Sequence, residues 1–352
     1  MMDYFHKNFI AISKALVIIL MVIGHSGCPV VMENIIYSFH MPFFFICSGY
    51  FFLPLQSVEQ LKSFGIKKLR GIYLPFIEWC LLFILLHNVF YYYNLYNDQF
   101  GFNGEVSHLY TIKDYAWDIV KNITTMGAIP QLLGGFWFLK NLLIAALFVG
   151  FLTFIIRKNT IRIRSALFTI LFTGAIFFNY YPVWSNIISS RDLFWSSAFF
   201  YSGYLLKGFQ TRGIHILLCL IVFILGNYLS LPCRLDFFSE RELMPLAYLT
   251  SISGSILIFR LSKLLENITC IRNVLYYLGN HTLIILSLHF LAFKIVNLMI
   301  IYHENLYFSH LAEFPIIENH QRYWILYTLI GVFVPVILYW LFSCIKLRIQ
   351  TK

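Results

Sequence analysis

The sequence predicts an all-α protein, a polytopic membrane helical bundle with about ten transmembrane helices and both termini in the cytoplasm. Of its 352 residues, 59% are hydrophobic and 12% are charged, whereas soluble domains usually carry about 25% charged residues. Apolar stretches near the ~20 residues that cross a bilayer recur along the whole chain. We therefore expect one transmembrane domain over residues 1–352, embedded in the lipid bilayer, with no extra-membrane catalytic domain.

The apolar stretches define the expected spans. The first is interpreted as a retained helix, because no small-residue cleavage site follows it. The sixth and seventh are the shortest. The ten expected spans cover residues 8–27, 35–55, 72–94, 136–156, 163–181, 192–208, 214–231, 243–262, 280–301 and 323–345.

The distribution of basic residues predicts the orientation. Of the 26 lysines and arginines, seventeen fall in one alternating set of loops with the two tails, six fall in the opposite loops and three fall within spans. Loops rich in Lys and Arg stay in the cytoplasm. The alternation requires an even number of spans, and it accounts for the net charge of +10, so no nucleic-acid partner is expected.

Two long loops are expected on the external side. The loop over residues 95–135 is rich in Tyr, Asn and Asp and is long enough to cap a cavity. The loop over residues 302–322 contains His303, His310 and His320. Their irregular spacing favours a solvated or interfacial loop over a metal site, and no metal is expected.

Polar side chains inside the spans are the first functional candidates, because they are costly in lipid. Lys14 and His25 lie eleven residues apart in the first span, so they share one helix face with ~16 Å between them along the axis. Alternatively, Lys14 reaches cytoplasmic headgroups and His25 sits at the interface. Glu78, Lys140 and His289 are further intramembrane candidates.

The second span begins with a distinctive aromatic segment. His40 stands two residues before Pro42, and proline suits the first turn of a helix. Ser48 and Gly49 are small residues that permit close helix contact. Because His40 is expected at the external end of this helix, level with His25, the two imidazoles form a candidate site for proton exchange near neutral pH.

These motifs resemble the acyltransferase-3 family of membrane proteins. The likeness begins with a lysine, ten residues and a histidine, followed by Phe-His-Met-Pro-Phe-Phe-Phe at 39–45 and Ser-Gly-Tyr at 48–50. It continues in order along nearly the whole chain. The later matching stretches are Lys67–Arg70 before Leu74–Pro75, Gly135–Leu139, Phe199–Tyr204 and Tyr277–His289.

The resemblance implies a ten-helix O-acyltransferase, most often an O-acetyltransferase, of the bacterial inner membrane. Such an enzyme takes an acyl group from cytoplasmic acyl-CoA, here acetyl-CoA or a related donor, and holds no bound cofactor. It transfers the group to a hydroxyl of a cell-surface polysaccharide or a lipid-linked glycan. The family's essential histidine maps to His25 and its arginine to Lys14, where lysine offers a point charge instead of a planar fork.

Acyl transfer assigns further roles. His25 is the expected general base, and Glu33 either orients its imidazole or is a solvated loop residue. His40 either holds the acceptor or makes a structural hydrogen bond, and Lys14 favours negative charge on the donor or its oxyanion. The remaining expected substrate contacts are Lys67, Lys68, Arg70 and Trp137. Topology and anionic lipid explain these basic residues equally well, and Trp137 equally suits an interfacial anchor.

Two other functions are open to this sequence. A carrier or flippase for a lipid-linked saccharide would also line its path with intramembrane charges, although no internal symmetry between the halves is visible. An acyltransferase relative without activity is the third possibility, for which Lys14 is the one indication. Thioester cleavage separates the first function from the other two. The sequence leaves the acceptor, the acyl group and the oligomeric state open.

Overall fold

The computed structural model describes residues 2–100, 106, 108–157, 160–185, 187–207, 212–229 and 243–350. Helices make up 81% of the structure, and the described parts contain no strand. The expected all-α class is confirmed, and the long apolar helices are those of a multi-pass membrane protein.

Seven helical segments are long and apolar enough to cross a membrane within the described residues. The helices at the other three expected spans are shorter: α5 Leu74–Leu85, α10 Ser190–Leu206 and α11 Gly213–Tyr228. A total of ten spans and a cytoplasmic location of the termini therefore stay predictions. The seven long candidates are Asn8–His25, Val30–Tyr50, Gln131–Ile156, Ile161–Tyr180, Met244–Leu265, Thr282–Glu304 and Gln321–Ile345.

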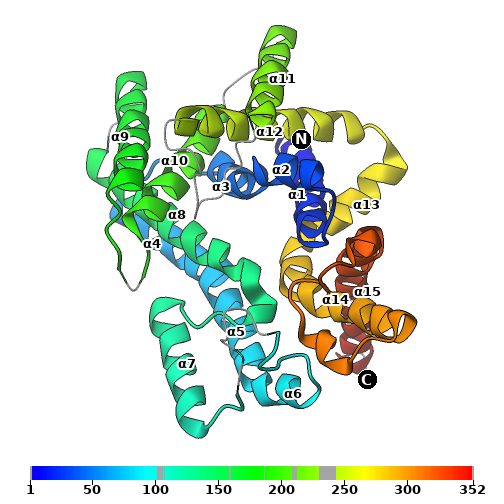
Figure 1. Ribbon diagram of the computed structural model, residues 1–352. Helices are drawn as coiled ribbons and strands as arrows, with labels where there is room; N and C mark the ends of the chain where they lie inside the picture. The colour runs from blue at the N-terminus through cyan, green and yellow to red at the C-terminus, as the bar shows by residue number, and fades with distance from the viewer. Residues whose placement is uncertain are drawn as a thin grey trace. The chain divides into compact units, whose positions relative to one another are not determined.

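The chain folds into two compact units, each assembled from separated stretches of sequence. Unit 1 contains residues 1–33, 78–136 and 264–352, and unit 2 contains residues 34–77 and 137–263. Figure 1 labels the helices of both. A single transmembrane domain over residues 1–352 stays a prediction.

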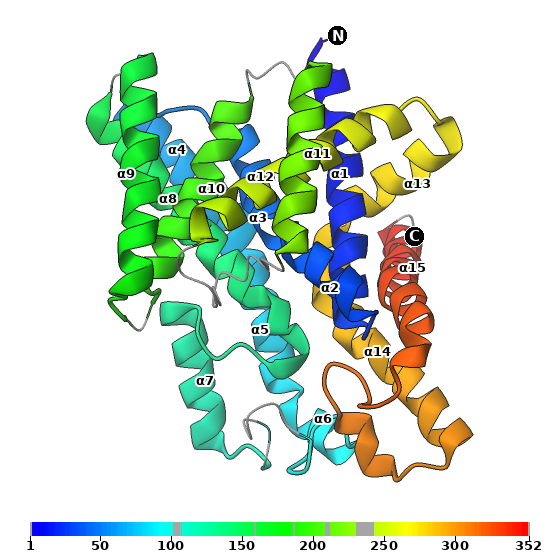
Figure 2. The same cartoon turned by 45° about the horizontal axis from the view of Figure 1, so that its top comes forward.

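Unit 1 is built around a long first helix. The main helices are α1 Met2–His25, α6 His87–Tyr92, α7 Ile112–Thr125, α13 Thr269–Asn280, α14 Thr282–Glu304 and α15 Trp324–Gln350. Helix α1 contacts α13, α14 and α15, and α14 lies beside α15 (Figure 2). Gly279 lets α13 approach α1 closely, because a Cβ there would overlap the carbonyl of Ala11.

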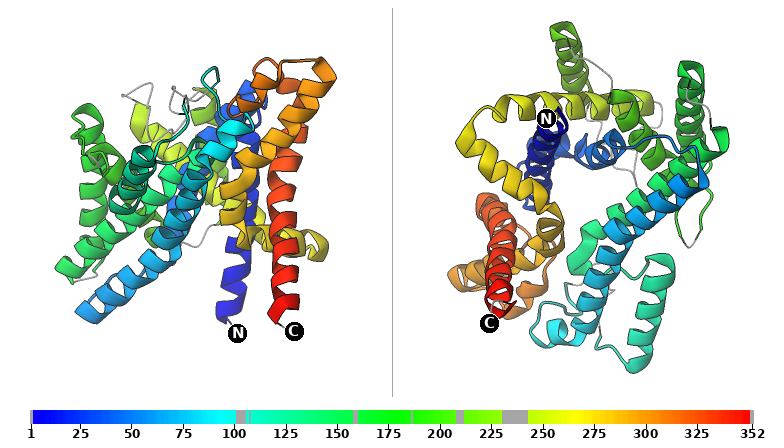
Figure 3. Two further views of the ribbon diagram at one scale, coloured as in Figure 1. Left: turned by 90° about the horizontal axis from the view of Figure 1, so that it is seen from below. Right: turned by 180° about the vertical axis from the view of Figure 1, so that it is seen from behind.

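In unit 1, the start of α1 and the end of α15 lie at the same end, and two long loops lie together. Figure 3 (left) draws the start of α1 and the end of α15 at the same end of unit 1. The two loops expected outside are joined to each other. The side-chain amides of Asn94 and Asn97 donate to the carbonyls of Phe308 and Ser309, each at 2.9 Å. The two loops must lie on the same side of the membrane to form these hydrogen bonds, as expected for two external loops.

Unit 2 packs α3 His40–Tyr50 against α10 through two glycines. A Cβ on Gly49 would collide with the carbonyl of Phe200, and a Cβ on Gly203 would collide with the carbonyl of Ile46. The two Ser-Gly-Tyr motifs, 48–50 and 202–204, therefore lie at one helix crossing. The close contact expected at Ser48 and Gly49 is confirmed. The other main helices are α4 Val58–Lys68, α8 Trp137–Ile156, α9 Ile161–Tyr180 and α12 Met244–Leu265.

Two expected spans are interrupted. The segment expected over 35–55 forms α2 Val30–Tyr37 and α3, with a break at Ser38–Phe39. The segment expected over 72–94 ends as α5 at Leu85 and resumes as α6. A π-helical turn, η1 Leu69–Tyr73, joins α4 to α5 immediately before Pro75. Proline has no N–H for the regular helical hydrogen bonds, and its ring clashes with the carbonyl four residues earlier. The wider π-helical turn accommodates the proline ring.

Candidate functional site

The end of α1 places His25 in the last helical turn. Ser26 donates from its backbone N–H and its hydroxyl to the carbonyl of Ile23, at 3.0 and 2.7 Å. Gly27 then adopts a φ of +77°, the left-handed conformation that commonly ends a helix. Lys14 lies on the same uninterrupted helix, and both Lys14 and His25 are half-buried. The expectation that one helix carries both residues is confirmed.

The ring of His25 stacks on a second histidine, His289 of α14. Their ring centroids lie 5.8 Å apart with an interplanar angle of 29°. We call these two residues the histidine pair. The sequence identified His289 as an intramembrane candidate but proposed His40 as the partner of His25. His40 belongs to unit 2, and its pairing with His25 stays a prediction.

Hydrogen bonding fixes the tautomer of His289. Its Nδ1 lies 3.1 Å from the carbonyl oxygen of Ile285 and 3.0 Å from that of Leu286. Because carbonyls only accept, Nδ1 carries the hydrogen, and Nε2 of the neutral ring holds a lone pair. The side chain is fully buried, and Nε2 has no hydrogen-bond partner among the described residues. An acceptor atom is therefore available inside the site.

Aromatic rings surround the histidine pair. Phe290 contacts both imidazoles, with centroid distances of 5.1 Å to His25 and 3.9 Å to His289. Phe314, from the loop between α14 and α15, packs on Phe290 at 4.6 Å. Gly134, just before the Gly-Phe-Trp-Phe-Leu stretch, lies against the same two phenylalanines, since a Cβ there would be 3.4 Å from Phe314 and 3.6 Å from Phe290. The imidazoles thus lie against aromatic side chains.

Glu33 lies in the first turn of α2, within unit 1. Burial, together with the nearby charge of Glu33, raises the pKa of the Cys28 thiol to about 11. The carboxylate is therefore close to the turn that follows His25. Orientation of the His25 imidazole by Glu33 stays a prediction.

His40 is the first residue of α3 and is 1% exposed. Its Nδ1 lies 2.9 Å from the carbonyl of Ile36, and its ring meets Tyr37 edge-on at 4.9 Å. The ring therefore bridges the break between α2 and α3, as the structural alternative expected. Binding of the acceptor by His40 stays a prediction.

Three basic residues of the α4–η1 segment, Lys67, Lys68 and Arg70, have different surroundings. The ammonium of Lys68 donates to the hydroxyl of Ser48 at 3.2 Å and lies over the rings of Phe64 and Phe200. Burial, with a smaller contribution from the charge of Lys67, lowers the pKa of Lys68 to about 8. Lys68 thus faces the interior of unit 2, whereas its two basic neighbours face outwards.

Lys67 and Arg70 line an open groove of about 710 Å³ on unit 2. Lys62 adds a third positive charge, and Glu59 is the one acidic residue in the lining. Such a groove suits an anion with several phosphates, because the basic charges converge on one surface. Trp137 begins α8 in unit 2 and is half-buried, and its contact with substrate stays a prediction.

Some of the site residues could be predicted from the sequence, and others could not. His289 was detectable because a histidine inside a span is costly. Phe290 and Phe314 gave no signal, because the chain contains 37 phenylalanines with nothing to separate packing rings from site rings. The histidines of the 302–322 loop bind separate partners: His303 contacts Glu304, His310 contacts Glu313 and His320 contacts the carbonyl of Glu318.

A half-buried imidazole beside a buried hydrogen-bond acceptor can take and return a proton. A family model described as an acyltransferase domain, that of the acyltransferase-3 family, matches residues 7–344. The searches of curated proteins and of solved structures found no match. Since the family model covers almost the whole chain, the protein belongs to the acyltransferase-3 family of membrane acyltransferases.

Proposed function

We propose that this protein is an O-acyltransferase, and specifically an O-acetyltransferase, of the bacterial inner membrane. It takes the acyl group from cytoplasmic acetyl-CoA or another acyl-CoA and transfers it to a hydroxyl of a cell-surface polysaccharide or a lipid-linked glycan. The observation that carries this proposal is the histidine pair, in which His25 stacks on a buried imidazole whose Nε2 has no hydrogen-bond partner within the described parts of the chain.

In the proposed reaction His25 acts as the general base. It takes the proton of the acceptor hydroxyl while the oxygen attacks the thioester carbonyl carbon. The C–S bond then breaks, and the leaving thiolate of CoA recovers the proton from the imidazolium. General-base assistance of this kind contributes ~10²–10⁴-fold to the rate. Nε2 of His289 is proposed to accept a hydrogen bond from the acceptor hydroxyl.

The donor is proposed to contact two basic regions. Lys14 lies ~16 Å along α1 from His25, so its ammonium is too far away to reach an oxyanion at His25. We propose that Lys14 instead contacts another part of the long donor molecule. Lys67 and Arg70, in the open groove, are the proposed partners of the CoA phosphates. A phosphate in such a groove gains from several charges at once.

Transfer of labelled acetyl groups from acetyl-CoA into lipid or glycan of membrane vesicles tests the proposal. We expect label transfer by the wild type, loss of ~10²–10⁴-fold in His25→Ala and no change in His303→Ala, an exposed histidine at the end of α14. The activity should also rise with pH as an imidazole loses its proton, and this acidic limb should vanish in His25→Ala.

A wild type that moves a lipid-linked saccharide across the membrane without cleaving the thioester would establish the flippase alternative. A wild type that does neither, at normal expression, would establish an inactive relative. Transfer by His25→Ala at the wild-type rate would contradict the role of His25.

A further inference from the structure

Lys294 is a buried cation that the proposed reaction does not use. It lies on α14, five residues after His289, and is 4% exposed. A charged side chain within a membrane-spanning helix is costly. Its ammonium donates to the backbone carbonyl of Glu313 at 2.6 Å. The cation therefore binds the loop that connects α14 to α15.

Two neighbouring side chains hold the same loop. Asn297, one turn further along α14, directs its amide to the carbonyls of Leu311 and Glu313, at 3.4 and 3.5 Å. Tyr327 of α15 donates its hydroxyl to Asn297 at 2.7 Å and accepts the backbone N–H of Ile317 at 3.3 Å. Lys294, Asn297 and Tyr327 thus tie α14, α15 and the loop together.

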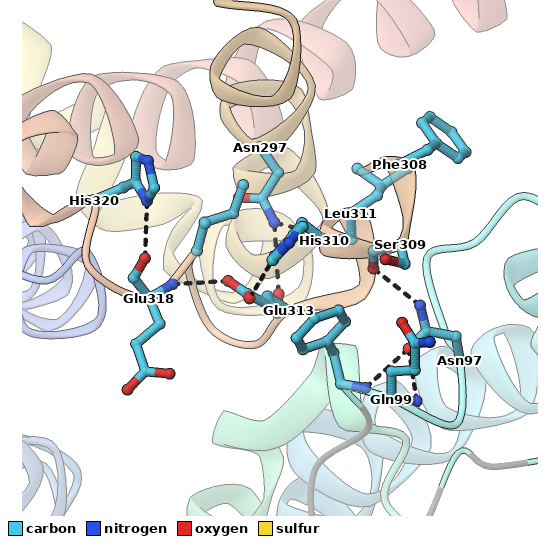
Figure 4. A network of polar contacts seen from close by, with 12 residues as sticks. Asn97, Gln99, Asn297, Phe308, Ser309, His310, Leu311, Glu313, Glu318 and His320 are labelled. Atoms are coloured by element: carbon cyan, nitrogen blue, oxygen red, sulfur yellow. Dashed lines mark hydrogen bonds and ion pairs between the residues drawn. The ribbon is translucent and has the colours of Figure 1, made fainter. Parts of the chain in front are cut away.

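The bound part of the loop, residues 308–320, is also folded by its own polar contacts (Figure 4). The carboxylate of Glu313 accepts from the ring of His310 at 2.8 Å and from the backbone N–H of Glu318 at 2.7 Å. Asn97 holds the same segment from the other long loop through the carbonyl of Ser309. The segment therefore has a defined shape when Lys294 binds it.

This segment packs against the neighbours of the histidine pair. Phe314 directly follows Glu313 and packs on Phe290, which touches both imidazoles. On the other side, Ile316 lies against Gly27, so closely that a Cβ on Gly27 would overlap its side chain. The carbonyl that Lys294 binds is thus one residue from the ring that packs on Phe290.

We propose that Lys294 is a positioning residue, which holds the 308–320 segment closed over the histidine pair by binding the carbonyl of Glu313. This inference rests on the proposed function for its effect on acyl transfer. The closed segment is also an independent structural statement, because it fixes how readily water and reagents reach His289. Lys294 acts through Phe314 and touches no reacting atom.

The test compares Lys294→Met, which removes the donor, with Lys294→Arg, which keeps a cationic donor, and with Lys121→Met, a control at an exposed lysine of α7. The first measurement is independent of activity. In purified, reconstituted protein, carbethoxylation of His289 and hydrogen exchange of the 308–320 peptide are followed by mass spectrometry. We expect both rates to rise ~10–100-fold in Lys294→Met, as for loss of a hydrogen bond to a charged group, with little change in Lys294→Arg and none in Lys121→Met.

The second measurement is acyl transfer over a range of pH. We expect kcat to fall on the order of 10–100-fold in Lys294→Met with KM for the acyl-CoA unchanged, because small misplacement at a reacting centre can cost ~10²-fold. The acidic limb of the pH profile should shift as His25 meets more water, and Lys294→Arg should restore kcat. Tyr327→Phe, which removes one hydroxyl from the same network, should show the same changes to a smaller extent.

Unchanged carbethoxylation and exchange in Lys294→Met would overturn the proposal, whatever the activity. Faster modification with unchanged kcat would overturn the positioning role. Faster modification in a protein whose wild type transfers no acyl group would support the closed segment and reject the proposed function. Equal exchange of α13 peptides in all variants shows that the rest of unit 1 is intact.

Discussion

His289 offers one ring nitrogen to two backbone carbonyls and keeps the other as an acceptor inside a buried site. If this acceptor holds the incoming hydroxyl, His289→Gln, which places an amide oxygen near the position of Nε2, should keep more activity than His289→Leu. We expect His289→Leu to lose about tenfold in kcat, the equivalent of one hydrogen bond. Steady-state transfer from labelled acyl-CoA measures this. Equal rates in the two variants would contradict the role.

Lys14 stands where the resemblance to the family implies an arginine. A donor contact that needs only a positive charge is kept in Lys14→Arg and lost in Lys14→Ala. We expect Lys14→Arg to retain the wild-type KM for acyl-CoA and Lys14→Ala to raise it severalfold, as measured by initial rates in vesicles. If Lys14 only reaches lipid headgroups, Lys14→Ala will transfer as well as the wild type.

Lys67 and Lys68 are adjacent in sequence and have different surroundings. Because Lys67 and Arg70 line the open groove, Lys67→Ala and Arg70→Ala should each raise KM for acyl-CoA by ~2–5-fold, as for exposed charge pairs. The effect should shrink at high salt. Because Lys68 is held by Ser48 and two rings, Lys68→Ala should mainly lower thermal stability. If Lys68→Ala raised KM for acyl-CoA as much as Lys67→Ala does, the different roles of the two lysines would be contradicted.

At the scale of elements, the crossing of α3 and α10 depends on two glycines. A methyl group at Gly49 or Gly203 would meet the backbone of the partner helix, and such overpacking costs about 1–3 kcal/mol or more. Gly49→Ala and Gly203→Ala should therefore lower the apparent Tm in detergent, measured by fluorescence-detected size exclusion after heating. Gly65→Ala is the matched control, because Gly65 of α4 has no atom within 4 Å of an added Cβ.

The control variant Gly65→Ala is not expected to lower the apparent Tm. Alanine in a helix interior is favoured over glycine by roughly 0.5–1 kcal/mol, so Gly65→Ala should match or exceed the wild-type Tm. Destabilisation of the same size in all three variants would show that the helix crossing is not the cause.

At the scale of the whole molecule, the distribution of Lys and Arg predicts which side of the membrane each loop faces. Cys270, near the start of α13, is an exposed free thiol in a region predicted to be cytoplasmic. A membrane-impermeant maleimide should label it only after the cells are made permeable. Thr124→Cys, on exposed α7, should instead be labelled in intact cells. The reverse pattern would invert the predicted topology.

Features that depend on local composition can be predicted from the amino-acid sequence alone. Apolar length fixed the helical membrane class, because only a helix satisfies its own backbone within one segment in lipid. The cost of polar groups in lipid identified Lys14, His25 and His289. The small residues of the two Ser-Gly-Tyr motifs indicated close helix contact, although not that the motifs meet each other.

Which of these residues lie together follows from the packing of the helices and could not be predicted from the sequence. His25 and His289 are more than 260 positions apart, and their stacking depends on the packing of α1 against α14. The inward position of Lys68 depends on contacts with Ser48 and Phe200 from other helices, and the closure by Phe314 depends on carbonyls bound by Lys294 and Asn297. Such contacts arise from helix packing and backbone hydrogen bonds, which no residue pattern along the chain encodes.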